Sequence, residues 1–182
     1  MIKAVRHYQD YVRHDDPVVE ASNFIALMVA ASQPFYPLYV YWILGPDFWP
    51  TLFTLLSTPF FIAVPALARV NSLAGCALLP IVGIANTAMS AALLGPRSGV
   101  LLFLAPCIVI ASLQFGRSER WLALIMAALA LAAFWGLQPG AYASLVALSE
   151  LEASRLVTLH AISVGTLLVV AGFSFARARS SR

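Results

Sequence analysis

The sequence predicts an all-α polytopic membrane protein, a bundle of six transmembrane helices preceded by an amphipathic juxtamembrane helix. Two observations carry this prediction. First, 61% of the 182 residues are hydrophobic and only 10% are charged, whereas a soluble domain has about 25% charged residues. Second, the apolar residues lie in long blocks, which indicates that lipid rather than water surrounds most of the chain.

Six apolar blocks have lengths within or close to the 17–25 residues that a helix needs to cross a bilayer. They cover about residues 21–44, 51–68, 73–94, 99–115, 121–137 and 157–176. Turn-forming or charged residues separate them, as in Gly45-Pro46-Asp47 and Gly95-Pro96-Arg97-Ser98. In lipid each segment has to satisfy its own backbone polar groups, so the blocks are predicted to be helices. The expected organisation is a segment 1–16, a membrane domain 17–176 and a basic tail 177–182.

Local signals place three helix starts. Residues 2–14 have Val5, Tyr8 and Val12 on one stripe, which is typical of an amphipathic helix lying on a membrane surface. Asp16-Pro17 predicts an N-cap followed by proline at the first helical position. Ser149 with Glu152 three residues later is a capping-box pattern, so the last helix is expected to begin near residue 150, before the bilayer.

The distribution of Lys and Arg predicts the orientation. With the N-terminus in the cytoplasm, nine basic residues lie inside and two, Arg97 and Arg155, lie outside. Cytoplasmic loops are enriched in Lys and Arg. Both ends of the chain are therefore expected in the cytoplasm, and the location is expected to be the inner (cytoplasmic) membrane of a bacterium.

The composition and motifs of the sequence argue against several classes of function. The hydrocarbon portions of the six spans contain no Asp, Glu, Lys or Arg, and proton-coupled pumps and many transporters need such residues. Cys76 and Cys107 have no CxxC spacing, so neither a disulfide framework nor a metal site is expected. No catalytic motif is found, no cofactor is expected, and no basic, aromatic-interleaved surface points to nucleic acid.

Prolines interrupt four of the predicted helices. A proline removes one N–H and leaves the carbonyl four residues earlier without its usual donor. Kinks are therefore expected at Pro34, Pro37, Pro59, Pro65, Pro80 and Pro106. Two interpretations stay open: the prolines shape a curved bundle, or the broken backbone lines a cavity.

Neutral polar side chains gather in the middle and outer half of the predicted membrane domain. The candidate ligand-binding residues are Gln33, Tyr36, Asn86, Ser90, Cys107, His160 and Ser163. Convergent polar groups in an apolar cavity form a ligand pocket, but the same residues also join helices through hydrogen bonds. His160 is the only histidine within a span, which argues against a haem held by two histidines; a lone histidine more often hydrogen-bonds to a neighbour.

A resemblance to a known family rests on four stretches of the chain. They are Asn23 with Gln33-Pro-Phe-Tyr-Pro-Leu-Tyr-Val40, then Leu56-Ser-Thr-Pro-Phe-Phe61, then Gly83-x-x-Asn86-Thr87, and Gly95-x-x-Ser98-Gly99-Val100-x-x-Phe103-Leu104-x-Pro106-Cys107. Together they resemble the six-helix N-terminal membrane anchors of bacterial class III adenylate cyclases. The resemblance covers roughly residues 1–176, and similar anchors occur on quorum-sensing histidine kinases.

The resemblance implies a receptor for lipophilic or quinone-like signals that controls a cytoplasmic catalytic domain, and hence cAMP signalling. It also implies a homodimer, because class III cyclase sites form between two chains. Some relatives look haem-binding, and the histidine count here departs from that pattern. The residues after the last span would suit a helix that continues into an output domain, or equally the end of a small stand-alone protein.

The expected function is therefore a membrane receptor or anchor that senses a lipophilic ligand and regulates a C-terminal cytoplasmic output domain. The 182 residues carry no catalytic machinery of their own in this interpretation. Two alternatives stay open: a small stand-alone membrane transporter and a structural membrane subunit.

Overall fold

A computed structural model describes residues 8–138 and 144–181, and throughout these residues the regular structure is helical, with no strand. The helices are α2 (Pro17–Ser32), η1 (Gln33–Phe35), α3 (Tyr36–Leu44), η2 (Gly45–Ser57), α4 (Thr58–Val70), α5 (Ser72–Leu94), η3 (Pro96–Ser98), η4 (Val100–Phe103), α6 (Leu104–Gln114), α7 (Arg120–Gly136) and α8 (Glu150–Ser180). Elements labelled η are 3-10 helices. The predicted all-α class is confirmed.

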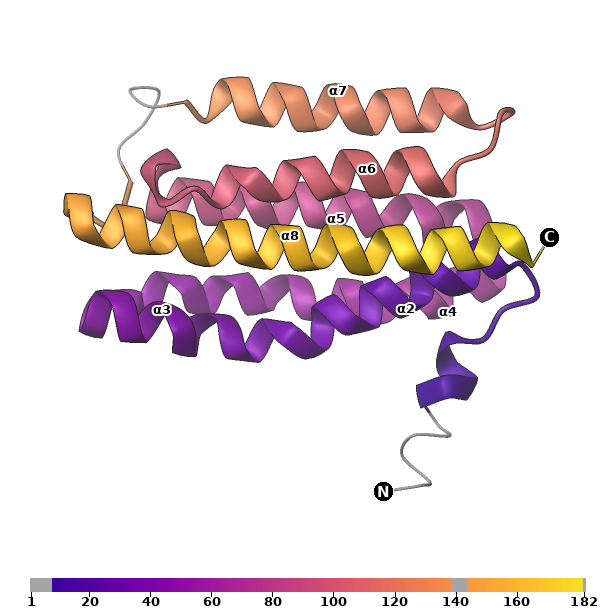
Figure 1. The fold of residues 1–182 in the computed structure, drawn as a ribbon, viewed down its shortest axis with the longest axis horizontal. Helices are drawn as coiled ribbons and strands as arrows, with labels where there is room; N and C mark the ends of the chain where they lie inside the picture. Colours follow the sequence, from indigo (N-terminus) through magenta and orange to yellow (C-terminus); the bar gives the residue numbers. More distant parts are fainter. Residues whose placement is uncertain (1–7, 139–143, 182) are drawn as a thin grey trace.

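The helices lie side by side with their axes roughly parallel (Figure 1). The longest helix, α8, runs the length of the bundle and contacts α2, α3 and α6. At the upper edge of the view, α7 packs against α5 and α6. The chain reverses direction after α3, so that α4 returns beside α2. One bundle therefore contains the helices from α2 to α8.

Three segments are long and apolar enough to cross a bilayer by length and composition: Pro17–Val70, Ser72–Leu94 and Glu150–Ser180. Two shorter apolar helices cover Val100–Gln114 and Arg120–Gly136. The 54 residues of the first segment contain the reversal between α3 and α4. Six crossings follow only if this segment crosses twice and the two shorter helices cross as well.

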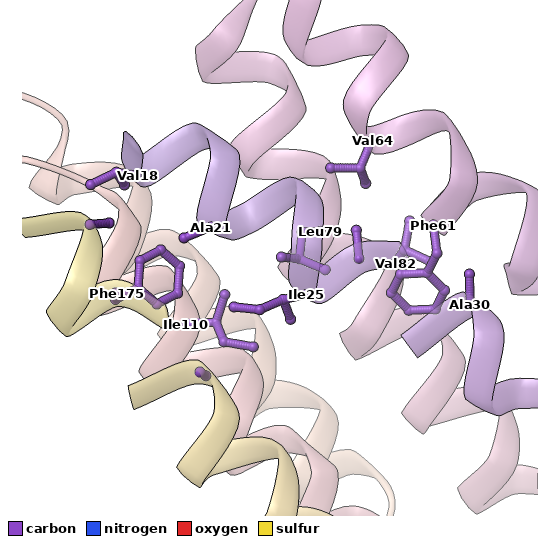
Figure 2. Packing of buried hydrophobic residues seen from close by; sticks show 13 residues of the cluster. Val18, Ala21, Ile25, Ala30, Phe61, Val64, Leu79, Val82, Ile110 and Phe175 are labelled. Atoms are coloured by element: carbon purple, nitrogen blue, oxygen red, sulfur yellow. The ribbon is translucent and has the colours of Figure 1, made fainter. Parts of the chain in front are cut away.

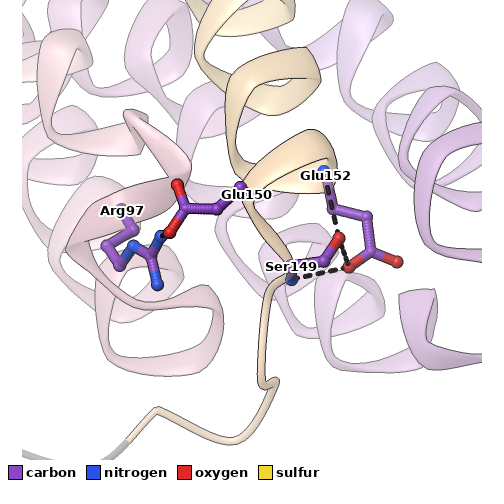
Figure 3. Close-up of polar contacts among 4 residues, drawn as sticks. All are labelled: Arg97, Ser149, Glu150 and Glu152. Atoms are coloured by element: carbon purple, nitrogen blue, oxygen red, sulfur yellow. Dashed lines mark hydrogen bonds and ion pairs between the residues drawn. The ribbon is translucent and has the colours of Figure 1, made fainter.

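Both predicted helix caps are confirmed. The Asp16 side chain accepts a hydrogen bond from the Val18 N–H, and Pro17 is the first residue of α2. At the start of α8, Ser149 and Glu152 form the reciprocal capping box, beside an ion pair between Arg97 and Glu150 (Figure 3). The side-chain and backbone hydrogen bonds from Ser149 lower the pKa of Glu152, because they stabilise the charged carboxylate.

The segment before α2 is held against the corner between α4 and α5. Of the predicted amphipathic helix 2–14, residues 8–12 are helical, residues 13 and 14 are not, and residues 2–7 lie outside the described residues. Arg69 Nη2 donates to the carbonyls of Asp10 at 2.9 Å and Tyr11 at 3.1 Å, and its guanidinium lies 4.9 Å from the Tyr11 ring centroid. The Tyr11 hydroxyl donates to the Ile62 carbonyl at 2.8 Å.

The prolines fall into two groups. Pro34 lies in the 3-10 turn η1 that separates α2 from α3, and Pro37, Pro59 and Pro106 lie in the first turns of α3, α4 and α6. By contrast, α4 runs through Pro65 and α5 runs through Pro80 without interruption. A bend at Pro65 or Pro80 stays a prediction.

Two predicted spans begin as 3-10 rather than α-helix. The chain from Gly45 to Ser57 is the 3-10 helix η2, and α4 begins only at Thr58. The predicted span 99–115 likewise starts with η4 before α6. Within η2, the hydroxyls of Thr51, Thr54 and Ser57 each donate to the carbonyl three residues earlier, the spacing that a 3-10 helix brings into register.

A hydrophobic cluster joins the beginning of α2 to the end of α8. Phe175, which is 1% exposed, packs with Val18, Ala21 and Ile25 of α2 and with Ile110 of α6. Figure 2 shows the Phe175 ring beside Ala21 and Ile110, with Phe61 and Leu79 further along the same cluster. The first turns of α2 and the last turns of α8 are therefore packed against each other at one end of the bundle.

Candidate ligand cavity

A cavity of about 390 Å³ lies inside the bundle, within the range of volumes typical of small-molecule pockets. Residues of α2, η1, α3, η2, α4, α5, η4, α6 and α8 line it. Most of the lining is apolar, contributed by residues such as Ile25, Phe61, Leu79, Phe103 and Ile110. The interrupted helix α2–η1–α3 forms one wall, because Ser32, Gln33 and Tyr36 all face the cavity.

The structure brings most of the predicted ligand-binding residues together around this cavity. The lining includes Gln33, Tyr36, Asn86, Ser90, Cys107 and Ser163. The seventh predicted residue, His160, is fully buried and lies behind two lining residues, Tyr36 and Phe103. Of the predicted kink prolines, Pro80 and Pro106 line the cavity.

His160 links α8 to two other parts of the bundle. Its Nδ1 lies 2.8 Å from the Ser98 carbonyl and its Nε2 lies 3.0 Å from the Tyr36 hydroxyl. A carbonyl can only accept, so in the neutral imidazole Nδ1 carries the proton and Nε2 accepts from Tyr36. Both ring nitrogens are thus occupied, and the rings of Tyr36 and Phe103 pack against the imidazole.

Gln33 is also held by protein partners. Its Nε2 donates to Ser57 Oγ at 2.5 Å, and its Oε1 accepts from Thr58 Oγ1. These bonds join the turn η1 to the junction between η2 and α4. Gln33 and His160 therefore act as the hydrogen-bonding links between helices that the sequence left open as an alternative.

Asn86 differs from both of them. Its Oδ1 is buried and has no hydrogen-bond partner among the described residues, although its side chain lines the cavity. A buried acceptor without a partner costs about 1–3 kcal/mol. One turn further along α5, the Ser90 hydroxyl donates to the Asn86 backbone carbonyl and not to the side chain. The Asn86 side-chain oxygen thus lacks a partner in the described part of the chain, and in this rotamer it is shielded from the cavity that the side chain lines.

The cavity is electrically neutral. Its lining residues include no Asp, Glu, Lys or Arg, and the part of the chain that the structure describes contains no cluster of His, Cys, Asp and Glu that could hold a metal ion. Placing a charged group there would incur a large desolvation cost without a counter-ion. The arrangement suits an uncharged, largely apolar molecule.

Exposed residues of the lining show where the cavity reaches the surface. Tyr39 of α3 is 45% exposed and Ile162 of α8 is 65% exposed, and both belong to the lining together with Ser32 and Thr166. All four lie on α2, α3 or α8. The opening is therefore lateral, between the helix pair α2–α3 and α8.

Sequence reasoning missed a second polar cluster, formed by Ser22, Cys76 and Gln114. Gln114 Oε1 accepts from Ser22 Oγ at 3.0 Å, and Gln114 Nε2 donates to the Cys76 carbonyl at 2.8 Å. Cys76 Sγ also lies 3.8 Å from Ser22 Oγ. Pro80 has no N–H for that carbonyl, so Gln114 replaces the missing donor. The orphaned carbonyl was visible in the sequence, but its partner on α6 was not.

The comparisons with known proteins give one family. The family model MASE7 matches residues 5–182, nearly the whole chain. No curated protein and no solved structure matches the sequence.

Proposed function

Because the chain belongs to the MASE7 family of membrane-associated sensor domains, we propose that it is a receptor that binds a lipophilic ligand in the cavity and regulates a cytoplasmic output domain. The observation that carries the proposal is the neutral cavity with the unpartnered amide of Asn86 in its lining. A cavity of this kind in a sensor domain is best accounted for by a molecule that occupies it.

The proposed receptor crosses the inner membrane six times. The crossings are α2–η1–α3, η2–α4, α5, η4–α6, α7 and α8, with both termini in the cytoplasm. Large apolar side chains face outward on these helices, among them Leu124 and Leu131 of α7 and Phe173 of α8. Lipid is the solvent that favours such a surface. The excess of Lys and Arg in the segments assigned to the cytoplasm supports the orientation.

The position of the lateral opening fits a ligand that arrives through the bilayer. A molecule dissolved in lipid would reach the cavity between α3 and α8, past Tyr39 and Ile162. It would not need to cross a water-filled passage. The proposed ligand therefore partitions into membranes before it binds.

The cavity and the cytoplasmic end of α8 share side chains, which supports a route for the signal. Ile25, Phe61, Leu79 and Ile110 line the cavity and also belong to the cluster that contains Phe175 and Ala178. A ligand shifts the bundle only if it binds one packing better than another. Repacking of Ile25 and Ile110 around the ligand would move Phe175, and α8 with it.

The proposed output follows from the resemblance to the membrane anchors of class III adenylate cyclases. In that arrangement α8 would continue into a cytoplasmic catalytic domain, and two chains would associate so that two catalytic domains meet. The ligand would then change the cAMP output of the dimer.

The test is a fusion of the chain to a class III cyclase catalytic domain, with cAMP production measured in membranes before and after addition of a chloroform extract of bacterial membranes. Ser163→Phe fills the cavity from α8, and Thr158→Phe is the matched control, because both hydroxyls donate to the carbonyl four residues earlier but Thr158 is exposed and outside the lining. The extract is expected to change cAMP output in the unsubstituted fusion and in Thr158→Phe, but not in Ser163→Phe. An equal response in the two variants, or none in the unsubstituted fusion, would contradict the proposal.

A structural subunit without a ligand is the second candidate, favoured by the hydrogen bonds that occupy Gln33 and His160. In that case the polar residues would only join helices, and filling the cavity would tighten the bundle without changing any output. The same pair of variants separates the two functions, because a structural role predicts that Ser163→Phe raises the melting temperature and leaves the fusion's activity unaltered.

A further inference from the structure

The hydrogen-bonding groups of the cavity narrow the chemical class of the ligand. Five lining hydroxyls donate to a carbonyl of their own helix: Ser32 to Val29, Thr54 to Thr51, Ser90 to Asn86, Ser163 to Leu159 and Thr166 to Ile162. A sixth, that of Tyr36, donates to His160. Each hydroxyl has one proton and two lone pairs, so these six have used their protons and keep only acceptor capacity.

Asn86 adds another acceptor. Its Oδ1 has no hydrogen-bond partner within the described part of the chain, and its side chain lines the cavity, so rotation of the amide would bring this oxygen to a ligand. The hydroxyls of Tyr39 and Thr87 in the same lining can donate in return. The group that best fits these partners both donates and accepts one hydrogen bond.

We infer that the ligand is an uncharged lipophile with a hydroxyl group, and that this hydroxyl donates to Asn86 Oδ1. The inference rests on the proposed function and adds the ligand's polar group to it. A ketone, quinone or ether can only accept and would leave Asn86 Oδ1 without a donor. A carboxylate would bring a charge into a lining that has no Lys or Arg to balance it.

The test uses the full chain in lipid nanodiscs and a photoactivatable probe, 1-dodecanol with a diazirine in its alkyl chain. Labelled residues are located by mass spectrometry. Unlabelled 1-dodecanol, dodecyl methyl ether or sodium laurate is added as a competitor, and the concentration of each competitor is expressed per mole of lipid. We expect labels on cavity-lining residues. Dodecanol is expected to compete at about tenfold lower concentration than the ether, the effect of satisfying one buried acceptor.

Substitutions of Asn86 test whether the preference for dodecanol over the ether depends on its side chain. Asn86→Leu is expected to remove the advantage of dodecanol over the ether while labelling of the lining continues, and Asn86→Ala serves the same purpose should the leucine variant fold poorly. Ser112→Ala is the control, because Ser112 is an exposed residue of α6 outside the lining whose hydroxyl also donates to its own helix, to the Ile108 carbonyl. It is expected to keep the tenfold preference.

The outcomes separate this inference from the proposed function. Equal competition by the ether, stronger competition by laurate, or a preference that survives in Asn86→Leu and Asn86→Ala would overturn the hydroxyl assignment while the labelled cavity still supports a lipophilic ligand. An absence of label on the lining residues would overturn both.

Discussion

Gln114 and Asn86 are two amides inside the same bundle, and they have opposite surroundings. Gln114 has a partner at each end of its amide, Ser22 Oγ at Oε1 and the Cys76 carbonyl at Nε2. Asn86 Oδ1 has none among the described residues, and its side chain faces the cavity. We call the surroundings of Ser22, Cys76, Gln114 and Phe175 the packed region and the surroundings of Asn86 the cavity region.

The two regions have similar residue types but different roles, one joining helices and the other lining a ligand site. Each region contains a proline of α5 or α6 and small polar side chains, so neither residue type nor predicted depth separates them. In the packed region every polar group of the cluster meets another, which fixes the contact of α2, α5 and α6. In the cavity region a polar group is left for a partner outside the chain. An unpartnered amide oxygen alone does not mark a ligand site, because Asn23 Oδ1 is also buried without a partner among the described residues and Asn23 does not line the cavity. Asn86 is distinguished because it combines an unpartnered oxygen with a place in the cavity lining.

The largest expected effect comes from exchanging these two amides for leucine. Gln114→Leu removes the donor to the Cys76 carbonyl, and we expect it to lower the free energy of unfolding by about 1–2 kcal/mol. Asn86→Leu removes an acceptor that already lacks a partner, so stability should stay constant or rise. Thermal unfolding of both variants in the same detergent checks this. A larger loss in Asn86→Leu than in Gln114→Leu would reverse the assignment of the two regions.

A smaller effect is expected at the border of the cavity. Tyr36→Phe leaves His160 Nε2 without its donor, and the expected loss is about 1 kcal/mol. Tyr39→Phe is the control, because Tyr39 is 45% exposed. Unfolding temperatures of the two variants compare the hydroxyls directly. If both variants unfold at the same temperature, the link from Tyr36 to His160 does not hold α3 to α8.

The first turn of α8 lies outside both the packed region and the cavity region. A substitution there gives a reference for the stability changes expected in the two regions. Ser149→Ala removes the capping box, and we expect a loss of about 0.5 kcal/mol that appears as faster hydrogen exchange over residues 150–154. The folded state lowers the pKa of Glu152, so the contribution of its carboxylate to the cap is complete at neutral pH. That contribution is lost as the pH falls through the lowered pKa, whereas the hydrogen bond from the Glu152 N–H to Ser149 Oγ does not titrate. Exchange that is equally fast in the unsubstituted chain would contradict the cap.

The smallest effect on stability is expected at Arg69, which holds the segment before α2. Arg69→Ala removes two exposed hydrogen bonds and the contact with the Tyr11 ring, so global stability should fall by only a few tenths of a kcal/mol. Local release should be larger, and trypsin should cleave faster after Arg13. Arg120→Ala, in α7, is the control. Unchanged cleavage in Arg69→Ala would show that the segment is held by other contacts.

The features that the sequence predicts best are those completed within a few residues. Asp16 caps the helix that begins at its neighbour, and Ser149 and Glu152 lie one turn apart. The helical class follows in the same way from the length of the apolar blocks. The η2 helix was missed because apolarity alone does not distinguish 3-10 from α-helical backbone, although Thr51, Thr54 and Ser57 have the spacing of three that its hydroxyl bonds use.

The candidate site was predicted as a set of residues but not as a set of roles. Gln33, Asn86 and His160 were grouped by depth, and the cavity does bring Gln33 and Asn86 together, with His160 one contact behind. The partners of Gln33 and His160, namely Ser57, Thr58 and Ser98, belong to segments whose rotation and register the sequence pattern does not specify. Only packing decides which amide finds a partner, and therefore which residue is free to bind.

The two cysteines offer the most direct measurement of the division between the regions. Cys107 lines the cavity, and Cys76 belongs to the packed region beside Ser22. Native membranes would be treated with an uncharged, membrane-permeant organomercurial, and mercuration of each thiol followed by mass spectrometry over time. We expect Cys107 to react well before Cys76, and Ser163→Phe to slow Cys107 alone. Equal rates for the two thiols, or faster reaction of Cys76, would contradict a cavity in this bundle.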